Sequence, residues 1–337
     1  MTRIWQRPAL IVPILILLLA GSGLLSLGVG TAEIPLRDVA GILTGEKLEG
    51  PAGTIVRDIR LPRLILGILI GAALAVAGAA MQGFFQNPMA DPYIVGVSSG
   101  AAFGATIGMV LHIDFWFAGL SATPILAFAG ALSVTFLVYA LALRGGRVPV
   151  TLLLLIGVAV GALAAAGTSF LMILGDEDLR LILFWLLGSL SSRRWDHVQM
   201  ILPYVTFGIA VIWAYARDLN LLLLGEETAH HTGVEVEGVK RMVLGASALL
   251  AAAAVSVSGL IGFVGLVVPH LVRLVVGPDH FRLIPVSALA GALLMVLADI
   301  LARILAAPSE IPIGIITSAL GCPFFLFLLS RKSNVSF

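Results

Sequence analysis

Apolar segments of bilayer length make up most of this chain. A helix that crosses a lipid bilayer needs roughly 20 apolar residues at about 1.5 Å each. Ten such segments can be marked, at residues 9–30, 63–82, 96–111, 119–143, 148–173, 197–216, 239–257, 260–275, 284–306 and 312–330. The pattern predicts an all-α membrane protein with about ten transmembrane helices, of which the third and the eighth are short.

The scarcity of charge supports this fold class. Only 12% of the 337 residues are charged and 59% are hydrophobic, whereas a soluble domain carries about 25% charged residues. A net charge of +1 gives no reason to expect a nucleic-acid partner. The first apolar segment follows Arg3 and Arg7 and is too long for a cleaved signal peptide, so we interpret it as a retained span. We expect residues 1–337 to form a single transmembrane domain.

A polar turn interrupts the apolar pattern between the second and third segments. Pro88 and Pro92 each disfavour helix in the residue before them, so the preceding helix must end there. Glycine then recurs at every fourth position and leaves bare backbone on one helix face, which a neighbouring helix in lipid can approach closely. We predict a helix–helix contact, without a catalytic role, at Gly96, Gly100, Gly104 and Gly108.

The longest polar interruption of the hydrophobic pattern covers residues 217–241. Leucines at 219 and 221–224 indicate a short amphipathic helix that ends at Gly225. A second short helix then begins at Glu226 and Glu227, where acidic residues suit the partial positive charge of a helix N-terminus. Gly233 fits the end of that helix. Two such helices outside the lipid favour docking of a soluble partner, and the alternative is a surface loop lying on lipid headgroups.

Basic residues near the span ends give an orientation. Arg144 and Arg147, and likewise Arg331 and Lys332, fall on the inner side when both termini are cytoplasmic. Several arginines then lie outside, where they either anchor to headgroups or meet an acidic partner. Asp299 and Arg303 are four residues apart, so they share a helix face and can form an ion pair.

No metal site is expected. His230 and His231 are adjacent, and adjacent positions on a helix do not face the same way. His270 has no co-ligand at a suitable spacing.

A series of motifs stands in one order between about residue 55 and residue 330. They are Arg60-Leu-Pro-Arg63, Gly71-Ala-Ala-Leu-Ala-Val-Ala-Gly78, Asn87-Pro-Met-Ala-Asp-Pro92, Gly96-Val-Ser-Ser-Gly-Ala101, Trp185-Leu-Leu-Gly-Ser-Leu190, Leu219-Asn-Leu-Leu-Leu-Leu-Gly-Glu-Glu-Thr-Ala229, Gly262-Phe-Val-Gly-Leu-Val-Val-Pro-His270, Gly277-Pro-Asp-His280, Ala298-Asp-Ile-Leu-Ala-Arg303, Glu310-Ile-Pro-Ile-Gly314 and Gly321-Cys-Pro-Phe-Phe325. In these motifs the chain resembles the permease subunits of type II ABC importers, the class that carries ferric siderophores, haem and cobalamin. Met89 and Cys322 replace a more common leucine and alanine.

The resemblance implies a homodimeric permease of the cell inner membrane, with ten spans per subunit and a translocation path at the dimer interface. Two ATP-binding subunits would dock on the cytoplasmic side and one substrate-binding protein on the outer side. The chain has no Gly-x-x-x-x-Gly-Lys-Ser/Thr phosphate loop, so ATP and Mg would be used by the partner ATPase. We therefore expect a translocation subunit that is not itself an enzyme and binds no cofactor.

The resemblance also implies roles for particular residues. The ATPase-coupling positions are Leu219, Leu222, Leu223, Gly225, Glu226, Glu227, Thr228, Ala229 and Gly233. The positions expected to dock the binding protein are Arg60, Arg63 and Arg303. The family places the translocation path along the fifth and tenth spans, where this chain supplies the small residues Gly157, Gly161, Gly167, Thr168, Gly314 and Ser318.

Other classes of function fit the sequence less well. A secondary transporter driven by an ion gradient needs ionisable residues within the membrane, and the centres of the ten segments hold almost none. An intramembrane zinc protease would show His-Glu-x-x-His, which is absent. The resemblance does not identify the cargo, which could be a ferric siderophore, haem, cobalamin or one of the oxyanions molybdate and tungstate.

Overall fold

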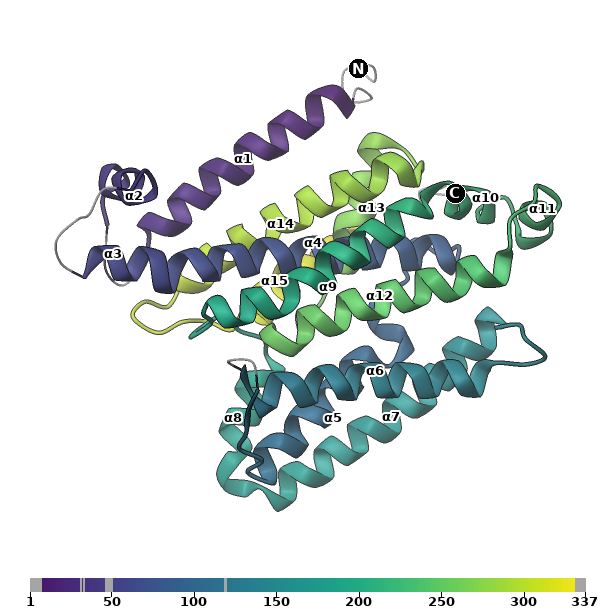
Figure 1. The fold of residues 1–337 in the computed structure, drawn as a ribbon, viewed down its shortest axis with the longest axis horizontal. Coiled ribbons are helices and arrows are strands. Elements are labelled where there is room, and N and C mark those ends of the chain that lie inside the picture. Colours follow the sequence, from purple (N-terminus) through teal and green to yellow (C-terminus); the bar gives the residue numbers. More distant parts are fainter. Residues whose placement is uncertain (1–7, 31, 33, 46–50, 118–119, 331–337) are drawn as a thin grey trace.

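The computed structural model describes residues 8–30, 32, 34–45, 51–117 and 120–330 and is almost entirely helical (Figure 1). The elements in chain order are α1 (Pro8–Gly28), α2 (Leu36–Leu43), α3 (Ala52–Thr54), η1 (Ile55–Arg60), α4 (Leu61–Phe84), η2 (Pro92–Val95), α5 (Val97–Val110), β1 (Trp116–Phe117), β2 (Leu120–Ser121), α6 (Ala122–Ala142), α7 (Val150–Leu174), η3 (Asp176–Asp178), α8 (Leu179–Leu186), α9 (Trp195–Ala214), α10 (Ala216–Leu222), α11 (Glu226–His231), α12 (Val236–Ser258), α13 (Val264–Val276), α14 (His280–Ile304) and α15 (Ile313–Ser330). Strands β1 and β2 form one antiparallel hairpin, with Trp116 opposite Ser121.

The long helices match the predicted spans. Within the described residues, 7 stretches are long and apolar enough to cross a membrane: α1, the continuous stretch Ala52–Phe84, α6, α7, α9, α12 and α14. The apolar helices α5, α13 and α15 supply the remaining three predicted segments. The prediction of short third and eighth segments is confirmed, because α5 has 14 residues and α13 has 13. Helix α8 has 8 residues, about 12 Å of helix, and is too short to span a bilayer.

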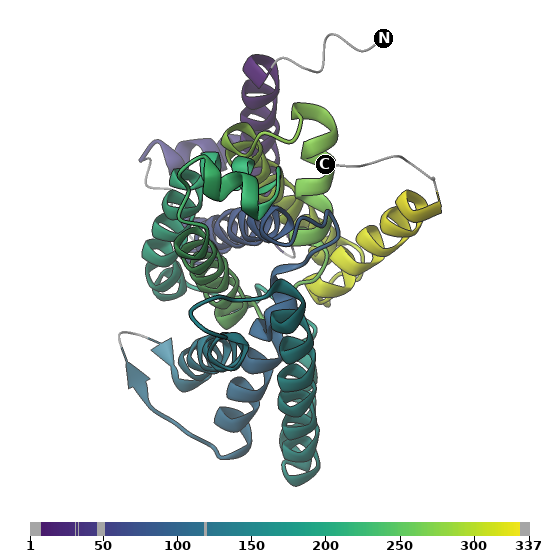
Figure 2. The same ribbon diagram turned by 90° about the vertical axis from the view of Figure 1, so that its right-hand side faces the viewer.

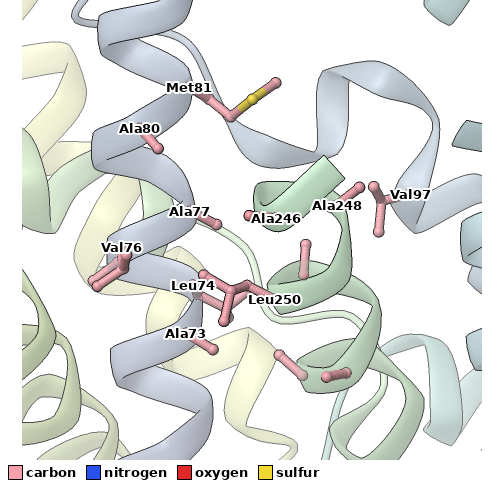
Figure 3. Close-up of a cluster of buried hydrophobic side chains, with 14 of the residues drawn as sticks. Ala73, Leu74, Val76, Ala77, Ala80, Met81, Val97, Ala246, Ala248 and Leu250 are labelled. Atoms are coloured by element: carbon pink, nitrogen blue, oxygen red, sulfur yellow. The ribbon is translucent and has the colours of Figure 1, made fainter. Parts of the chain in front are cut away.

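Helices α4 and α12 form the centre of the bundle. In the most apolar window of each, 78% of the residues are buried. Figure 3 shows Leu74 and Ala77 of α4 facing Leu250 and Ala246 of α12. The many alanines on both helices add little bulk, so the two backbones can pack closely, as helices in lipid do. Figure 1 shows α1 and α14 on one side of this pair and α5, α6 and α7 on the other.

The bundle has two distinct ends. Figure 1 shows α2, α3, α8 and the β1–β2 hairpin at one end, which we call the α2 end. At the other end lie α10, α11 and the turn at residues 144–147 that joins α6 to α7, and we call it the α11 end. Any partner outside the membrane would meet the chain at one of these two ends.

The polar turn after α4 forms as the prolines predict. Helix α4 ends at Phe84, and the short helix η2 begins at Pro92. Gly96 follows with φ +87°, a backbone conformation that side-chain-bearing residues rarely adopt, and α5 starts directly after it. The glycine face of α5 then lies against α6: a Cβ at Gly100 would sit 2.5 Å from the carbonyl oxygen of Gly130, and one at Gly104 would meet the carbonyl oxygen of Leu126.

Candidate functional site

The segment α10–α11 has the local structure that the sequence predicts. Helix α10 ends at Leu222, and Gly225, with φ +105°, precedes the first turn of α11. Glu226 and Glu227 open α11, and Thr232 caps it before Gly233, which also has a positive φ of +92°. Glycine tolerates this conformation without strain, which explains why two helices of seven and six residues can turn so sharply.

Hydrogen bonds fix this segment to the ends of two long helices. Nε2 of Gln86, just after α4, donates to the carbonyl oxygen of Leu222 at 2.6 Å. Asn220 Nδ2 donates to Oδ1 of Asp279 at 2.7 Å, and the backbone N–H of His280 donates to Oδ1 of Asn220 at 2.9 Å. Asp279 and His280 form the N-terminus of α14. The segment is therefore a rigidly held part of the bundle.

The predicted coupling residues divide into three groups by exposure. Leu219, Leu222 and Ala229 are buried within the chain, so their side chains hold the segment onto the bundle and cannot face a partner. Leu223 and Gly225 are half-buried. The outward surface is formed by Glu226, Glu227, Thr228 and Gly233, together with Leu224, which is not among the predicted residues. A hollow of about 610 Å³ adjoins it, lined by Arg147, Glu226, Glu227, His230, Gly233, Val234, Glu235, Val236 and Glu237. The structure thus presents a short helix with acidic residues beside a hollow.

The α2 end holds a buried cluster of charges. Arg63 on α4 contacts Asp299 on α14 at 2.9 Å and, through Nη1, Oε1 of Glu310 at 2.9 Å. Arg303, one turn after Asp299, places Nε 3.2 Å from Oδ2 of Asp299. The predicted pairing of Asp299 with Arg303 is confirmed. We refer to Arg63, Asp299, Arg303 and Glu310 as the α2-end ion cluster.

Arg60 and Arg303 also bind the C-terminal end of α1. Nη1 of Arg60 donates to the carbonyl oxygens of Leu27 and Gly28 at 2.7 and 2.8 Å, and its Nη2 donates to that of Ala32. Nη1 of Arg303 donates to the carbonyl oxygens of Ser26 and Val29 at 3.0 and 2.8 Å. The last carbonyls of a helix lack partners within it and carry partial negative charge. Two guanidinium groups therefore cap this helix end.

These contacts leave the predicted docking arginines little exposed. Arg60, Arg63 and Arg303 have exposed fractions of 6%, 8% and 7%. Burial opposes ionisation of Glu310, but the hydrogen bond and the positive charge of Arg63 outweigh it and hold the pKa of the Glu310 carboxyl below its usual range. An outside partner could bind these arginines only by taking the place of acceptors inside the chain.

Four of the six small residues predicted to line a path pack against other parts of the same chain. A Cβ at Gly157 would lie 2.6 Å from the carbonyl oxygen of Ile94, and one at Gly167 would lie 2.7 Å from the ring of Phe103. Thr168 is buried and donates to the carbonyl oxygen of Ala164 at 3.0 Å. A Cβ at Gly314 would meet the carbonyl oxygen of Leu187. The small size of these four residues lets helices and loops of the same chain approach, and their predicted place on a path between two copies stays a prediction.

Gly161 and Ser318 are partly exposed, as Gly167 and Gly314 also are. A Cβ at Gly161 would lie 3.3 Å from Oγ of Ser99 and would meet no backbone. The outward faces of their helices are large and apolar: α7 exposes Leu163 and Ile173, and α15 exposes Ile315 and Leu320. Figure 2 shows α15, in yellow, standing away from the rest of the bundle. These two helices present the broad apolar surfaces that lipid or another membrane helix would cover.

Sequence reasoning missed Glu310 as a partner of Arg63, and it missed Ser26, whose hydroxyl accepts from Nη2 of Arg303 at 2.6 Å. It also missed Lys240, which is buried at the start of α12. No local signal marks these residues, except that Glu310 begins a motif of the family.

A bundle of apolar helices with a polar helix pair at one end and buried ion pairs at the other defines a multi-pass membrane transport protein. The model of the FecCD transport family matches residues 15–331. The chain therefore belongs to that family, which comprises the permease subunits of ABC importers that its motifs resemble.

Individual relatives agree with this assignment. The chain is 53% identical to the cobalamin import system permease protein BtuC of Halobacterium salinarum, over 83% of this chain and 74% of that one. It is 41% identical to the hemin transport system permease protein HmuU of Yersinia pestis, over 97% of both chains. It is 39% identical to the Fe(3+) dicitrate transport system permease protein FecD of Escherichia coli, over 94% of this chain and 96% of that one.

The fold also matches a solved structure. An inward-facing metal-chelate type ABC transporter superimposes with a TM-score of 0.85 at 31% sequence identity, covering 96% of this chain and 100% of that chain. The type II permease architecture that the motifs imply is thereby confirmed.

Proposed function

We propose that this chain is the permease subunit of an ATP-driven importer that carries a metal chelate across the cell inner membrane. Two copies would enclose the path, with both termini cytoplasmic, and ATP and Mg would be used by two separate subunits. The observation that carries this proposal is the helix pair α10–α11, a polar segment anchored by Gln86 and Asn220 to an otherwise apolar bundle. A lipid-embedded chain without a phosphate loop needs such a rigid contact to receive work from a soluble ATPase.

The α11 end is then the cytoplasmic end, and α11 is the contact for the ATPase. Leu224, 66% exposed, is the leucine of this segment that can enter a groove on a partner. Leu224→Glu should remove most of the ATPase that co-purifies with the permease, because it places a charge in an apolar contact. Leu111, 62% exposed at the α2 end, is the matched control, and Leu111→Glu should leave co-purification unchanged. Equal retention of the ATPase by both variants would contradict the assignment of α11.

The second copy would cover the exposed apolar faces of α7 and α15. Cysteines at Leu163 and Leu320 in a Cys322→Ser background test this contact, since both side chains are exposed in the single chain. Oxidation should give a covalent dimer of the doubly substituted chain in membranes. A chain that stays monomeric on oxidation and in native mass measurement would contradict the homodimer.

A metal chelate is the cargo that the relatives favour. Identity is 53% to the cobalamin permease, against 41% and 39% to the haemin and ferric dicitrate permeases. We therefore propose cobalamin as the first cargo to test, with haem and ferric chelates as the alternatives in the same class. The small oxyanions molybdate and tungstate are the alternative cargo outside this class.

Uptake into proteoliposomes tests the whole proposal. The permease is reconstituted with its ATPase and its binding protein, and uptake of radiolabelled cyanocobalamin, haemin, ferric citrate and molybdate is compared with and without ATP. We expect ATP-dependent uptake of one of the three chelates and no uptake under an ion gradient alone. Uptake without the ATPase, driven by a proton or sodium gradient, would overturn the proposal in favour of a secondary transporter.

A further inference from the structure

Lys240 is a buried cation in the first turn of α12. Its side chain is only 6% exposed, and its ammonium group lies 2.7 Å from Oε2 of Glu226 and 3.3 Å from Oε1 of Glu237. Glu226 is the first residue of α11, whereas Glu237 belongs to α12 itself. One ammonium group therefore joins the start of α11 to the start of α12.

The contact continues beyond Lys240. The second oxygen of Glu237, Oε2, accepts the backbone N–H of Val148 at 3.1 Å. Val148 directly follows the tight turn in which Arg144 and Arg147 exchange backbone hydrogen bonds of 2.9 and 3.0 Å. That turn connects α6 to α7. The chain of contacts thus runs from α11 through Lys240 and Glu237 to the turn between α6 and α7.

Arg241, the residue after Lys240, is a cation in a very different environment. Arg241 has the same charge, but its side chain is 58% exposed and its contact with Glu235 is 3.6 Å long. Exposed pairs of that kind contribute little to stability, since water and salt screen them. A buried ammonium group is costly unless carboxylates compensate it. Without Lys240, the carboxylates of Glu226 and Glu237 would face each other uncompensated, and α11 would lose its ionic link to the start of α12.

We propose that Lys240 is a positioning residue that couples the place of α11 to the turn between α6 and α7. A displacement of α11 by a bound partner then moves the turn at residues 144–147, and with it the membrane helices α6 and α7. This inference rests on the proposed function, in which an ATPase binds α11. It adds a defined route by which that contact reaches the membrane helices.

A nitroxide at residue 144 tests the route. Arg144 is exposed, so Arg144→Cys in a Cys322→Ser background can be labelled in the complete complex with the ATPase. Electron paramagnetic resonance spectra are recorded in proteoliposomes before and after addition of ATP and orthovanadate. Co-purified ATPase and its hydrolysis rate are measured in the same samples. The complex with Lys240 intact should show a nucleotide-dependent spectral change.

The variants separate positioning from docking. Lys240→Met should reduce the spectral change at least fivefold while the ATPase remains bound and active, and Lys240→Arg should restore it, because arginine keeps the buried charge. Arg241→Met is the matched control and should behave as the parent. Glu237→Ala removes the carboxylate that joins Lys240 to Val148, and should give the same loss as Lys240→Met; the two changes together should add nothing further.

The outcomes are distinct. If Lys240→Met and Glu237→Ala leave the spectral change intact, or if bound, active ATPase causes no change at residue 144 in the parent, the inference is overturned. If no ATPase co-purifies with the parent, the proposed function itself fails.

Discussion

Arg63 and Asp299 lie 236 residues apart in the sequence, and both Nε and Nη2 of the guanidinium lie 2.9 Å from Oδ1 of the carboxylate. The second oxygen of Asp299, Oδ2, lies 3.2 Å from Nε of Arg303, so one buried carboxylate compensates two buried cations. Because Arg63 also binds Glu310, the α2-end ion cluster joins α4, α14 and the loop before α15. It fixes the helix ends at the α2 end of the bundle.

Substitution of Asp299 should therefore lower the stability of the fold more than substitution of any other residue of the cluster. Asp299→Asn leaves Arg63 and Arg303 without their shared counter-charge, and breaking a buried ion pair on one side costs about 3–5 kcal/mol. We expect a clearly lower thermal unfolding temperature in detergent. Asp58→Asn, which changes an exposed acid at the same end, should leave that temperature unchanged. Equal unfolding temperatures for the two variants would show that the cluster contributes nothing to the fold.

Glu310 should make part of the stability depend on pH. Its pKa is lowered in the folded chain, since the hydrogen bond and charge of Arg63 outweigh the effect of burial. A lowered pKa stabilises the fold above the usual glutamate pKa of 4.5, and this stabilisation is lost as the pH falls through the lowered value. The parent should therefore unfold at a higher temperature than Glu310→Gln at pH 7, with the gap closing under acid conditions. A gap that widens on acidification would refute this assignment.

The glycine face of α5 predicts a contrast between two single substitutions. A Cβ at Gly104 would meet the carbonyl oxygen of Leu126, which is backbone and cannot turn away, whereas a Cβ at Gly245 would find no atom within 4 Å. Gly104→Ala should destabilise the folded chain by about 1–3 kcal/mol, as overpacking does. Gly245→Ala should instead raise stability by about 0.5–1 kcal/mol, because it lowers the entropy of the unfolded chain. Denaturant or thermal unfolding of the two purified variants measures both signs, and a loss of stability in both would contradict the packing argument.

The helices and their breaks were predictable because their signals are local. Gly225, Gly233 and the acidic pair Glu226–Glu227 mark the ends of two short helices within a few residues. The prolines after α4 act on their immediate neighbours in the same way. The ion pair between Asp299 and Arg303 follows from helical spacing alone.

The partners of the arginines could not be predicted, because they come from distant parts of the chain. Nothing near Arg60 indicates that it will bind the carbonyls at the end of α1, more than 30 residues earlier for Leu27 and Gly28. The surroundings of the small residues of α7 could not be predicted for a related reason. Glycine spacing indicates close approach of some backbone, but it does not say whether a helix of the same chain or an open passage lies opposite. Gly157 faces the carbonyl of Ile94 in this chain.

A binding protein could reach Arg63 only by displacing one of the two carboxylates that Arg63 binds inside the chain. Glu310 is the more exposed of its two internal partners, with 32% of its side chain exposed against 4% for Asp299. An acidic residue of a docking protein would therefore compete with Glu310 first. Glu310→Gln weakens this competitor, so it should raise the association rate of the binding protein several-fold, measured by biolayer interferometry at two ionic strengths. Glu177→Gln, an exposed acid at the same end, changes the net charge equally and separates competition from general attraction. If both variants bind at the same rate, Arg63 belongs to the fold alone, and the expected docking role of Arg60, Arg63 and Arg303 falls with it.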